Sequence, residues 1–82
     1  MTGPFKLVAQ PISHDSIEAL NELLTQAKQG NLIGVAFAAM YEKGNYSVDV
    51  AGEAYKSPTF ARGMVKALDD RLRDILHELS ST

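Results

Sequence analysis

The stretch Leu32–Ala54 predicts two antiparallel strands joined by a tight turn, because two strand-forming runs flank the turn-forming residues EKGN. The first run, Leu32–Tyr41, is apolar on both faces, whereas the second, Tyr46–Ala54, alternates apolar and polar residues. A strand with two apolar faces is normally covered on both. The fold is therefore limited to a hairpin packed against other parts of the chain or against another copy of it.

The register of the two strands depends on the length of the turn. A loop of two or four residues places Phe37 opposite Val50 and gives one continuous apolar face. A loop of three residues, with Gly44 in the left-handed conformation, shifts the pairing by one and places Phe37 opposite Asp49. We predict the first register because the second opposes an aromatic side chain with a carboxylate.

Helical patterns flank the hairpin on both sides. Residues 14–30 begin where Ser13 or Asp15 can cap a helix, the latter with Glu18 in the manner of a capping box, and they end at Gly30, which suits a left-handed C-cap. In the second helix, residues 58–79, Gly63 predicts a close crossing with a neighbouring backbone. Its apolar residues follow the a/d spacing of a two-helix seam: Ala61, Val65, Leu68, Leu72, Ile75 and Leu79.

These elements predict a single α+β domain over residues 1–82, in the order helix, antiparallel hairpin (residues 32–54), helix. We expect both helices on the large-residue face that contains Phe37, and residues 1–13 as an arm or, over residues 5–10, a short edge strand. A two-stranded hairpin is marginal by itself, so we expect a homodimer, in which two hairpins either join edge to edge into one extended sheet or stack their small-residue faces. The candidate interface residues are those of the small-residue face of the first strand: Gly34, Ala36, Ala38 and Met40.

Composition restricts the functions that this chain can have. A formal net charge of −2 offers no general attraction to nucleic acid or to anionic membranes, although a local basic patch would be compatible with it. The absence of cysteine excludes disulfides and a cysteine nucleophile, and it fits a reducing compartment, so we expect the cytoplasm. The longest apolar run, Leu32–Tyr41, is shorter than the roughly 20 residues of a membrane helix, and no membrane partner is expected.

The sequence predicts no catalytic residue, no metal site and no cofactor. Asp70, Asp74 and His77 share one helical face, but a metal site there would need ligands from a second copy. Charged residues of this helix are expected to pair with one another: Lys66 with Asp70, Asp69 with Arg73, and Arg71 with Asp74 or Glu78. The one candidate site is an anion site at the start of the second helix, formed by free N–H groups and by Ser57, Thr59, Arg62 and Lys66.

Three motifs between Gly34 and Leu72 are KGNY at 43–46, AGEA at 51–54, and SPTFARG at 57–63 running into ALDD at 67–70. With them the chain resembles a family of small, functionally uncharacterised proteins of bacteria and their phages. The resemblance implies a bacterial or phage setting and no particular activity. We therefore expect a non-enzymatic homodimeric interaction module. The alternative is a small anion- or nucleic-acid-binding protein, and an enzyme comes third.

Overall fold

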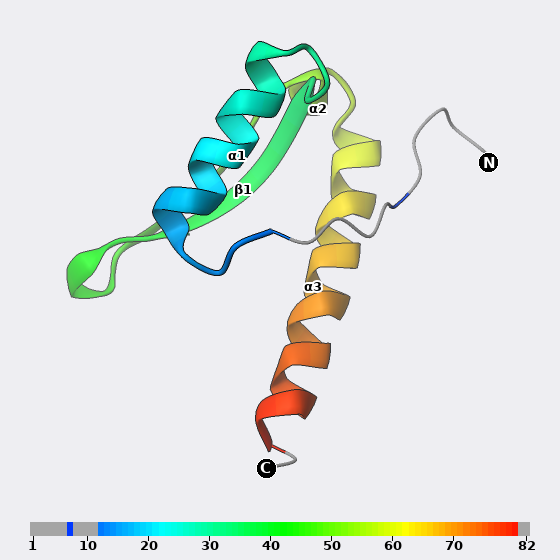
Figure 1. Ribbon diagram of the computed structural model, residues 1–82. Helices are drawn as coiled ribbons and strands as arrows, with labels where there is room; N and C mark the ends of the chain where they lie inside the picture. Colours follow the sequence, from blue (N-terminus) through cyan, green and yellow to red (C-terminus); the bar gives the residue numbers. More distant parts are fainter. Residues whose placement is uncertain (1–6, 8–11, 81–82) are drawn as a thin grey trace. The chain divides into compact units, whose positions relative to one another are not determined.

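The computed structural model describes residue 7 and residues 12–80. The chain divides after Leu32 into two compact parts, and each part is described by itself. The first part contains helix α1 (Ser16–Lys28). The second contains β1 (Gly34–Met40), turn η1 (Glu42–Gly44), β2 (Tyr46–Gly52), α2 (Glu53–Lys56) and α3 (Pro58–Ser80), as Figure 1 shows. This order confirms the α+β fold of helix, antiparallel hairpin and helix. The single domain over residues 1–82 stays a prediction, and the edge strand at residues 5–10 lies outside the described residues except for Leu7, which is in no strand.

Helix α1 begins and ends at residues that the sequence identifies. Asp15 is the N-cap, and its Oδ2 accepts a hydrogen bond from the Glu18 N–H at 3.0 Å. The Glu18 carboxylate accepts a bond from the Ser13 hydroxyl at 2.7 Å, which adds a second link at this end. At the other end Gly30 has a φ of +83° and its N–H bonds to the carbonyl of Ala27, as in a Schellman motif. The predicted N-cap and left-handed glycine are both confirmed.

Strands β1 and β2 pair antiparallel in a two-stranded sheet, with Phe37 opposite Asp49. The predicted pairing of Phe37 with Val50 is therefore wrong by one residue. The cause is the turn, in which three residues connect the strands and both Lys43 and Gly44 have positive φ, +72° and +84°. A lysine in the left-handed region is unusual, and the sequence pattern does not show that this turn would take it.

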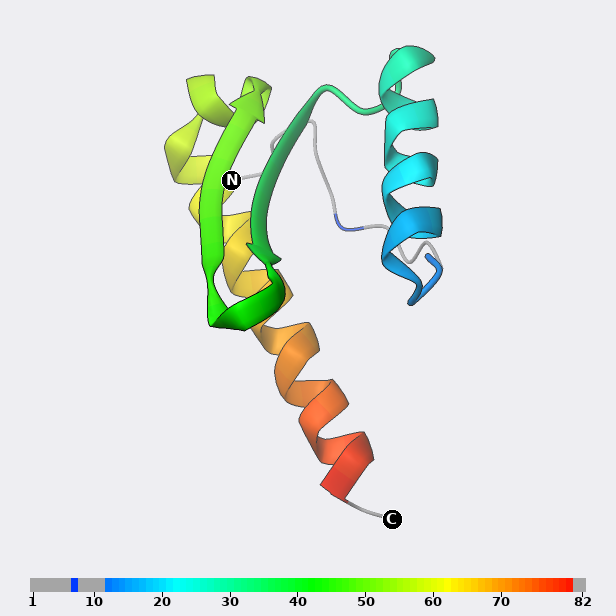
Figure 2. The same cartoon turned by 90° about the vertical axis from the view of Figure 1, so that its left-hand side faces the viewer.

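The one-residue shift changes which side chains share a face of the sheet. Since side chains alternate along a strand, Phe37 shares its face with Asp49, and the small residues of β1 share theirs with the valines of β2. Helix α3 crosses the second of these faces (Figure 2). Four of the six hairpin residues that line the space beneath it belong to that face, and two α3 residues close it: Ala36, Ala38, Val48 and Val50 with Val65 and Leu68.

The expectation that this helix packs on the Phe37 face is thus wrong. Small side chains at Ala36 and Ala38 leave room for α3, and the valines opposite them supply the apolar contact surface. Phe37 is 42% exposed and is not the buried aromatic residue that the predicted register implied. The packing of α1 on the hairpin stays a prediction.

The end of the hairpin is joined to the helices at a pair of glycines, Gly34 and Gly52, which lie opposite each other. Gly52 has a φ of +68°, and a Cβ on it would collide with the carbonyl oxygen of Ile33. A Cβ on Gly34 would lie 2.6 Å from the backbone nitrogen of Ala54. The two backbones therefore approach more closely than any side chain permits, and β2 ends at Gly52, before the predicted end of the hairpin at residue 54.

Very little of the described chain is fully buried. Only Ala54 and Ala61, at the junction of α2, α3 and the hairpin, fall below a tenth of their full exposure, at 7% and 4%. The exposed large apolar side chains of α3 range from 36% at Met64 to 70% at Leu79. No described atom lies within 4 Å of where a Cβ on Gly63 would be, so the close crossing predicted there is wrong.

Two glycine substitutions should have opposite effects on stability. Gly34→Ala should destabilise the hairpin by about 1–3 kcal/mol, because its methyl group would clash with the backbone of Ala54. Gly63→Ala should stabilise α3 by about 0.5–1 kcal/mol, because alanine costs less than glycine in a helix interior and the space is open. Urea unfolding midpoints measure both effects. An unchanged midpoint for Gly34→Ala would contradict the tight junction between β1 and α2.

Candidate functional site

Two of the four residues predicted to form an anion site line the same hollow, and the site itself stays a prediction. Arg62 and Lys66 line one open hollow, whose other walls come mainly from apolar residues of β2, α2 and α3. Ser57 and Thr59 do not line this hollow. Ser57 ends α2, and its carbonyl oxygen accepts the backbone N–H of Ala61 at 3.0 Å. The hollow therefore has mainly apolar walls, and its charged residues are Arg62, Lys66 and Asp69.

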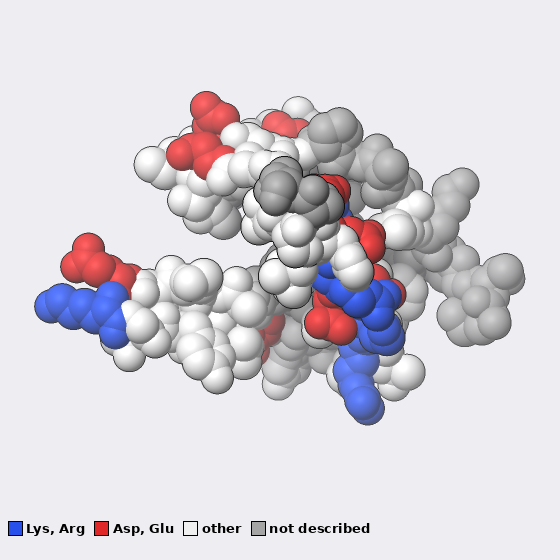
Figure 3. All heavy atoms as spheres, turned by 90° about the horizontal axis from the view of Figure 1, so that it is seen from below, with Lys and Arg blue, Asp and Glu red and all other residues white. Residues whose placement is uncertain are grey.

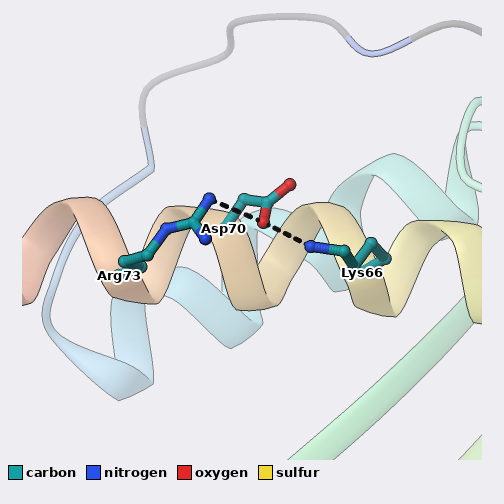
Figure 4. A network of polar contacts seen from close by, with 3 residues as sticks. All are labelled: Lys66, Asp70 and Arg73. Carbon is teal, nitrogen blue, oxygen red and sulfur yellow. Dashed lines mark hydrogen bonds and ion pairs between the residues drawn. The ribbon is translucent and has the colours of Figure 1, made fainter.

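One of those two cations is already paired. Lys66 Nζ lies 2.8 Å from Asp70 Oδ1, and Arg73 Nη2 lies 3.0 Å from the same oxygen (Figure 4). The hydrogen bond from Lys66 lowers the pKa of Asp70, and the same bond raises the pKa of Lys66. The predicted Lys66–Asp70 pair is confirmed, whereas Arg73 bonds to Asp70 and not to the predicted Asp69. All three side chains are largely exposed to solvent, at 68% for Lys66, 43% for Asp70 and 63% for Arg73.

A second ion pair runs along the border of the apolar side of α3. Arg71 Nη1 lies 3.7 Å from Glu78 Oε1, which confirms one of the two pairings expected for Arg71. On the face drawn in Figure 3, the main group of blue side chains has red side chains directly beside it. The neighbouring carboxylates reduce the attraction of this group for a nucleic-acid backbone.

The four residues predicted for a dimer interface lie in three different surroundings. Gly34 packs against the backbone at the start of α2. Ala36 and Ala38 line the space beneath α3, and Met40 is 92% exposed near the turn. Helix α3 therefore occupies part of the face that we expected to be open. Participation of these residues in a dimer stays a prediction.

The second half of α3 is an exposed apolar feature of residues 33–82, and it extends past the turn of the hairpin (Figures 1 and 2). Leu72, Leu76 and Leu79 are 52%, 66% and 70% exposed. Together with two neighbours on the same side of the helix they form what we call the distal seam: Leu68, Leu72, Ile75, Leu76 and Leu79. The a/d spacing in the sequence identifies most of this set, whereas only the structure shows that its leucines are exposed and that Ile75 is half-buried.

Removing the Lys66 ammonium should raise the pKa of Asp70 from its lowered value toward the usual 3.8. We expect this for Lys66→Gln in an NMR titration of the Asp70 carboxyl carbon. Because the folded pKa is lowered, the stabilisation from Asp70 is complete above pH 3.8 and is lost as pH falls through the folded pKa. Lys56→Gln, which removes a cation paired with Glu53 instead, is the control and should leave the Asp70 titration unchanged. An unaltered Asp70 midpoint in Lys66→Gln would contradict the assigned cause.

The residues that the structure describes lack both a metal-binding cluster and a membrane-spanning helix. They contain no cluster of three or more histidine, aspartate or glutamate side chains placed to hold a metal. Within the same residues, no helix is both long enough and apolar enough to cross a membrane. No family model, no curated protein and no solved structure matches the chain. The feature with the clearest physical consequence is the exposed apolar side of α3, which suits binding to another apolar surface.

Proposed function

We propose that this chain is a non-enzymatic homodimeric interaction module that acts in the cytoplasm of a bacterium or in a phage-infected cell. The observation that carries the proposal is the distal seam, in which three leucines are more than half exposed along one side of α3. Monomeric proteins rarely leave a continuous apolar stripe of this kind in contact with water. The resemblance at residues 43–46, 51–54 and 57–70 supports the bacterial or phage setting.

The small size of the chain gives a second reason for self-association. A domain of 82 residues buries a modest fraction of its surface, so its apolar core is small and supplies limited stability. Among the described residues only two alanines are less than a tenth exposed, and alanine contributes little apolar area. A second copy would remove the exposed leucines of α3 from water, at about 0.8 kcal/mol for each buried methylene group. Dimerisation thus supplies the apolar contact that one copy lacks.

Anion binding has weaker support. A phosphate group near Arg62 would meet Lys66 already bonded to Asp70, with Asp69 on the wall of the same hollow. The carboxylates reduce the positive potential that would attract a phosphate. The interaction module is therefore the function that the side chains favour.

Sedimentation equilibrium at tens of micromolar should give twice the chain mass of 8.9 kDa. The thermal unfolding midpoint should also rise with protein concentration, because association stabilises the folded state by mass action. A single-chain mass at every concentration, together with an unfolding midpoint independent of concentration, would contradict the homodimer.

Short single-stranded DNA added at low salt should leave the backbone amide signals of Ser57, Arg62 and Lys66 unchanged. The reason is that Lys66 is paired and that the net charge of the chain is −2. Arg62→Ala is the matched variant and should behave as the unmodified chain does. Shifts that disappear in Arg62→Ala and weaken with added salt would instead support an anion- or nucleic-acid-binding protein.

A further inference from the structure

We propose that two copies of the chain associate through the distal seam as an antiparallel pair of α3 helices. In this arrangement Leu72 of one copy packs opposite Ile75 of the partner subunit, and Arg71 lies beside Glu78 of the partner subunit. The inference rests on the proposed homodimer, and it adds the surface, the direction and the register of the contact.

The location follows from where the hairpin stops covering α3. The space between the sheet and α3 is lined from the helix side by Val65 and Leu68. Further along, Leu72, Leu76 and Leu79 are each at least half exposed, and the helix continues to Ser80. Figure 2 shows this half of α3 running beyond the turn of the hairpin. The apolar side of the helix therefore continues past the sheet that covers its first half.

The spacing of the apolar residues matches a helix as the occupant. Leu68, Leu72, Ile75 and Leu79 lie four, three and four residues apart, which is the a/d repeat of packed helices. In an antiparallel helix pair, heptad position a of one helix packs against heptad position d of the other. Two such registers bury the seam: one with Leu72 opposite Ile75 of the partner subunit, and one with Leu68 opposite Leu72 of the partner subunit.

The charges at the borders of the seam distinguish these arrangements. Arg71 and Glu78 lie on the same border, since their side chains are 3.7 Å apart within one chain. With Leu72 opposite Ile75 of the partner subunit, each Arg71 lies beside Glu78 of the partner subunit, so two attractive pairs form. With Leu68 opposite Leu72 of the partner subunit, Arg71 lies beside Arg71 of the partner subunit. On the other border Asp69 lies beside Asp69 of the partner subunit, so both contacts join like charges.

A parallel pair is also disfavoured by these charges. It would place Arg71 beside Leu76 of the partner subunit, where the guanidinium finds no carboxylate across the interface. Charge complementarity therefore selects one direction and one register of the three. In that arrangement the four side chains, two arginines and two glutamates, alternate in sign along one border of the helix pair.

Charge exchange tests whether the Arg71–Glu78 attraction acts between chains. Arg71→Glu alone places glutamate beside glutamate across the interface, and Glu78→Arg alone places arginine beside arginine, so each should weaken dimerisation by about tenfold or more. Mixing the two variants restores both opposite-charge contacts, so the mixture should form heterodimers nearly as tightly as the unmodified chain forms homodimers. Arg73→Glu, the same change on the outer side of α3, is the control and should leave the dissociation constant unchanged.

A purely intrachain role for the pair predicts a different result. Each variant chain has lost its internal pair, and mixing cannot restore it, so no gain on mixing would overturn the proposal. Sedimentation velocity of each variant and of the mixture measures all of these dissociation constants.

Disulfide cross-linking tests the register independently, since the chain has no cysteine of its own. A mixture of Leu72→Cys and Ile75→Cys chains should form a mixed disulfide under mild oxidation, while Leu72→Cys alone should not. A disulfide between two Leu72→Cys chains would indicate a parallel pair, and one between Leu68→Cys and Leu72→Cys chains would indicate the other register. Either result would overturn the proposal. A dimer by mass that shows no cross-link and no effect of the charge changes would also overturn it while leaving the homodimer intact, whereas a monomer would overturn both.

Discussion

The register of the hairpin determines how the second part of the chain packs. With Ala38 opposite Val48, the small residues of β1 and the valines of β2 form one apolar face, and α3 lies across it. The predicted register would move Val48 and Val50 to the other face and would place Asp49 and Ala51 opposite Ala38 and Ala36 beneath α3. Asp49 is tolerated opposite Phe37 because its carboxylate accepts the Val50 N–H at 2.8 Å and shares a face with exposed Phe37.

The junction between the sheet and α2 depends on this pairing as well. Gly34 and Gly52 are opposite each other only in this register, and the close approach of the two backbones needs the absence of a Cβ at both positions. The N–H of Glu53 bonds to the carbonyl of Ile33 at 2.9 Å, which holds the start of α2 against the beginning of β1. Helix α3 then follows after Ser57 and is directed over the small-residue face.

The two sides of α3 have different roles. Its charged side is largely satisfied within the helix, as Lys66, Asp70 and Arg73 show, and exposed pairs of this kind contribute little to stability. Its apolar side is buried at Ala61, whereas Leu72, Leu76 and Leu79 near the other end are each more than half exposed. A helix of this type contributes fully to a folded core only when another apolar surface covers its far end, which is why self-association is the function that we propose.

Several features of this protein follow from the sequence alone. The order of elements, the Asp15 cap, the left-handed Gly30 and the Lys66–Asp70 pair all depend on residues within a few positions of each other. Local spacing and local hydrogen bonds therefore identify them. The a/d spacing of α3 likewise indicates a seam, although it does not show how much of that seam the hairpin covers.

Only the tertiary structure decided the register, the face under α3 and the surroundings of Gly63. The register depends on two successive residues, Lys43 and Gly44, taking positive φ, and a lysine gives no sequence signal for that conformation. Since β1 is apolar on both sides, its sequence pattern is compatible with either face beneath a helix. Contacts between residues far apart in the chain settled the choice, because the small side chains of Ala36 and Ala38 admit α3 and the valines of β2 complete the surface that it covers.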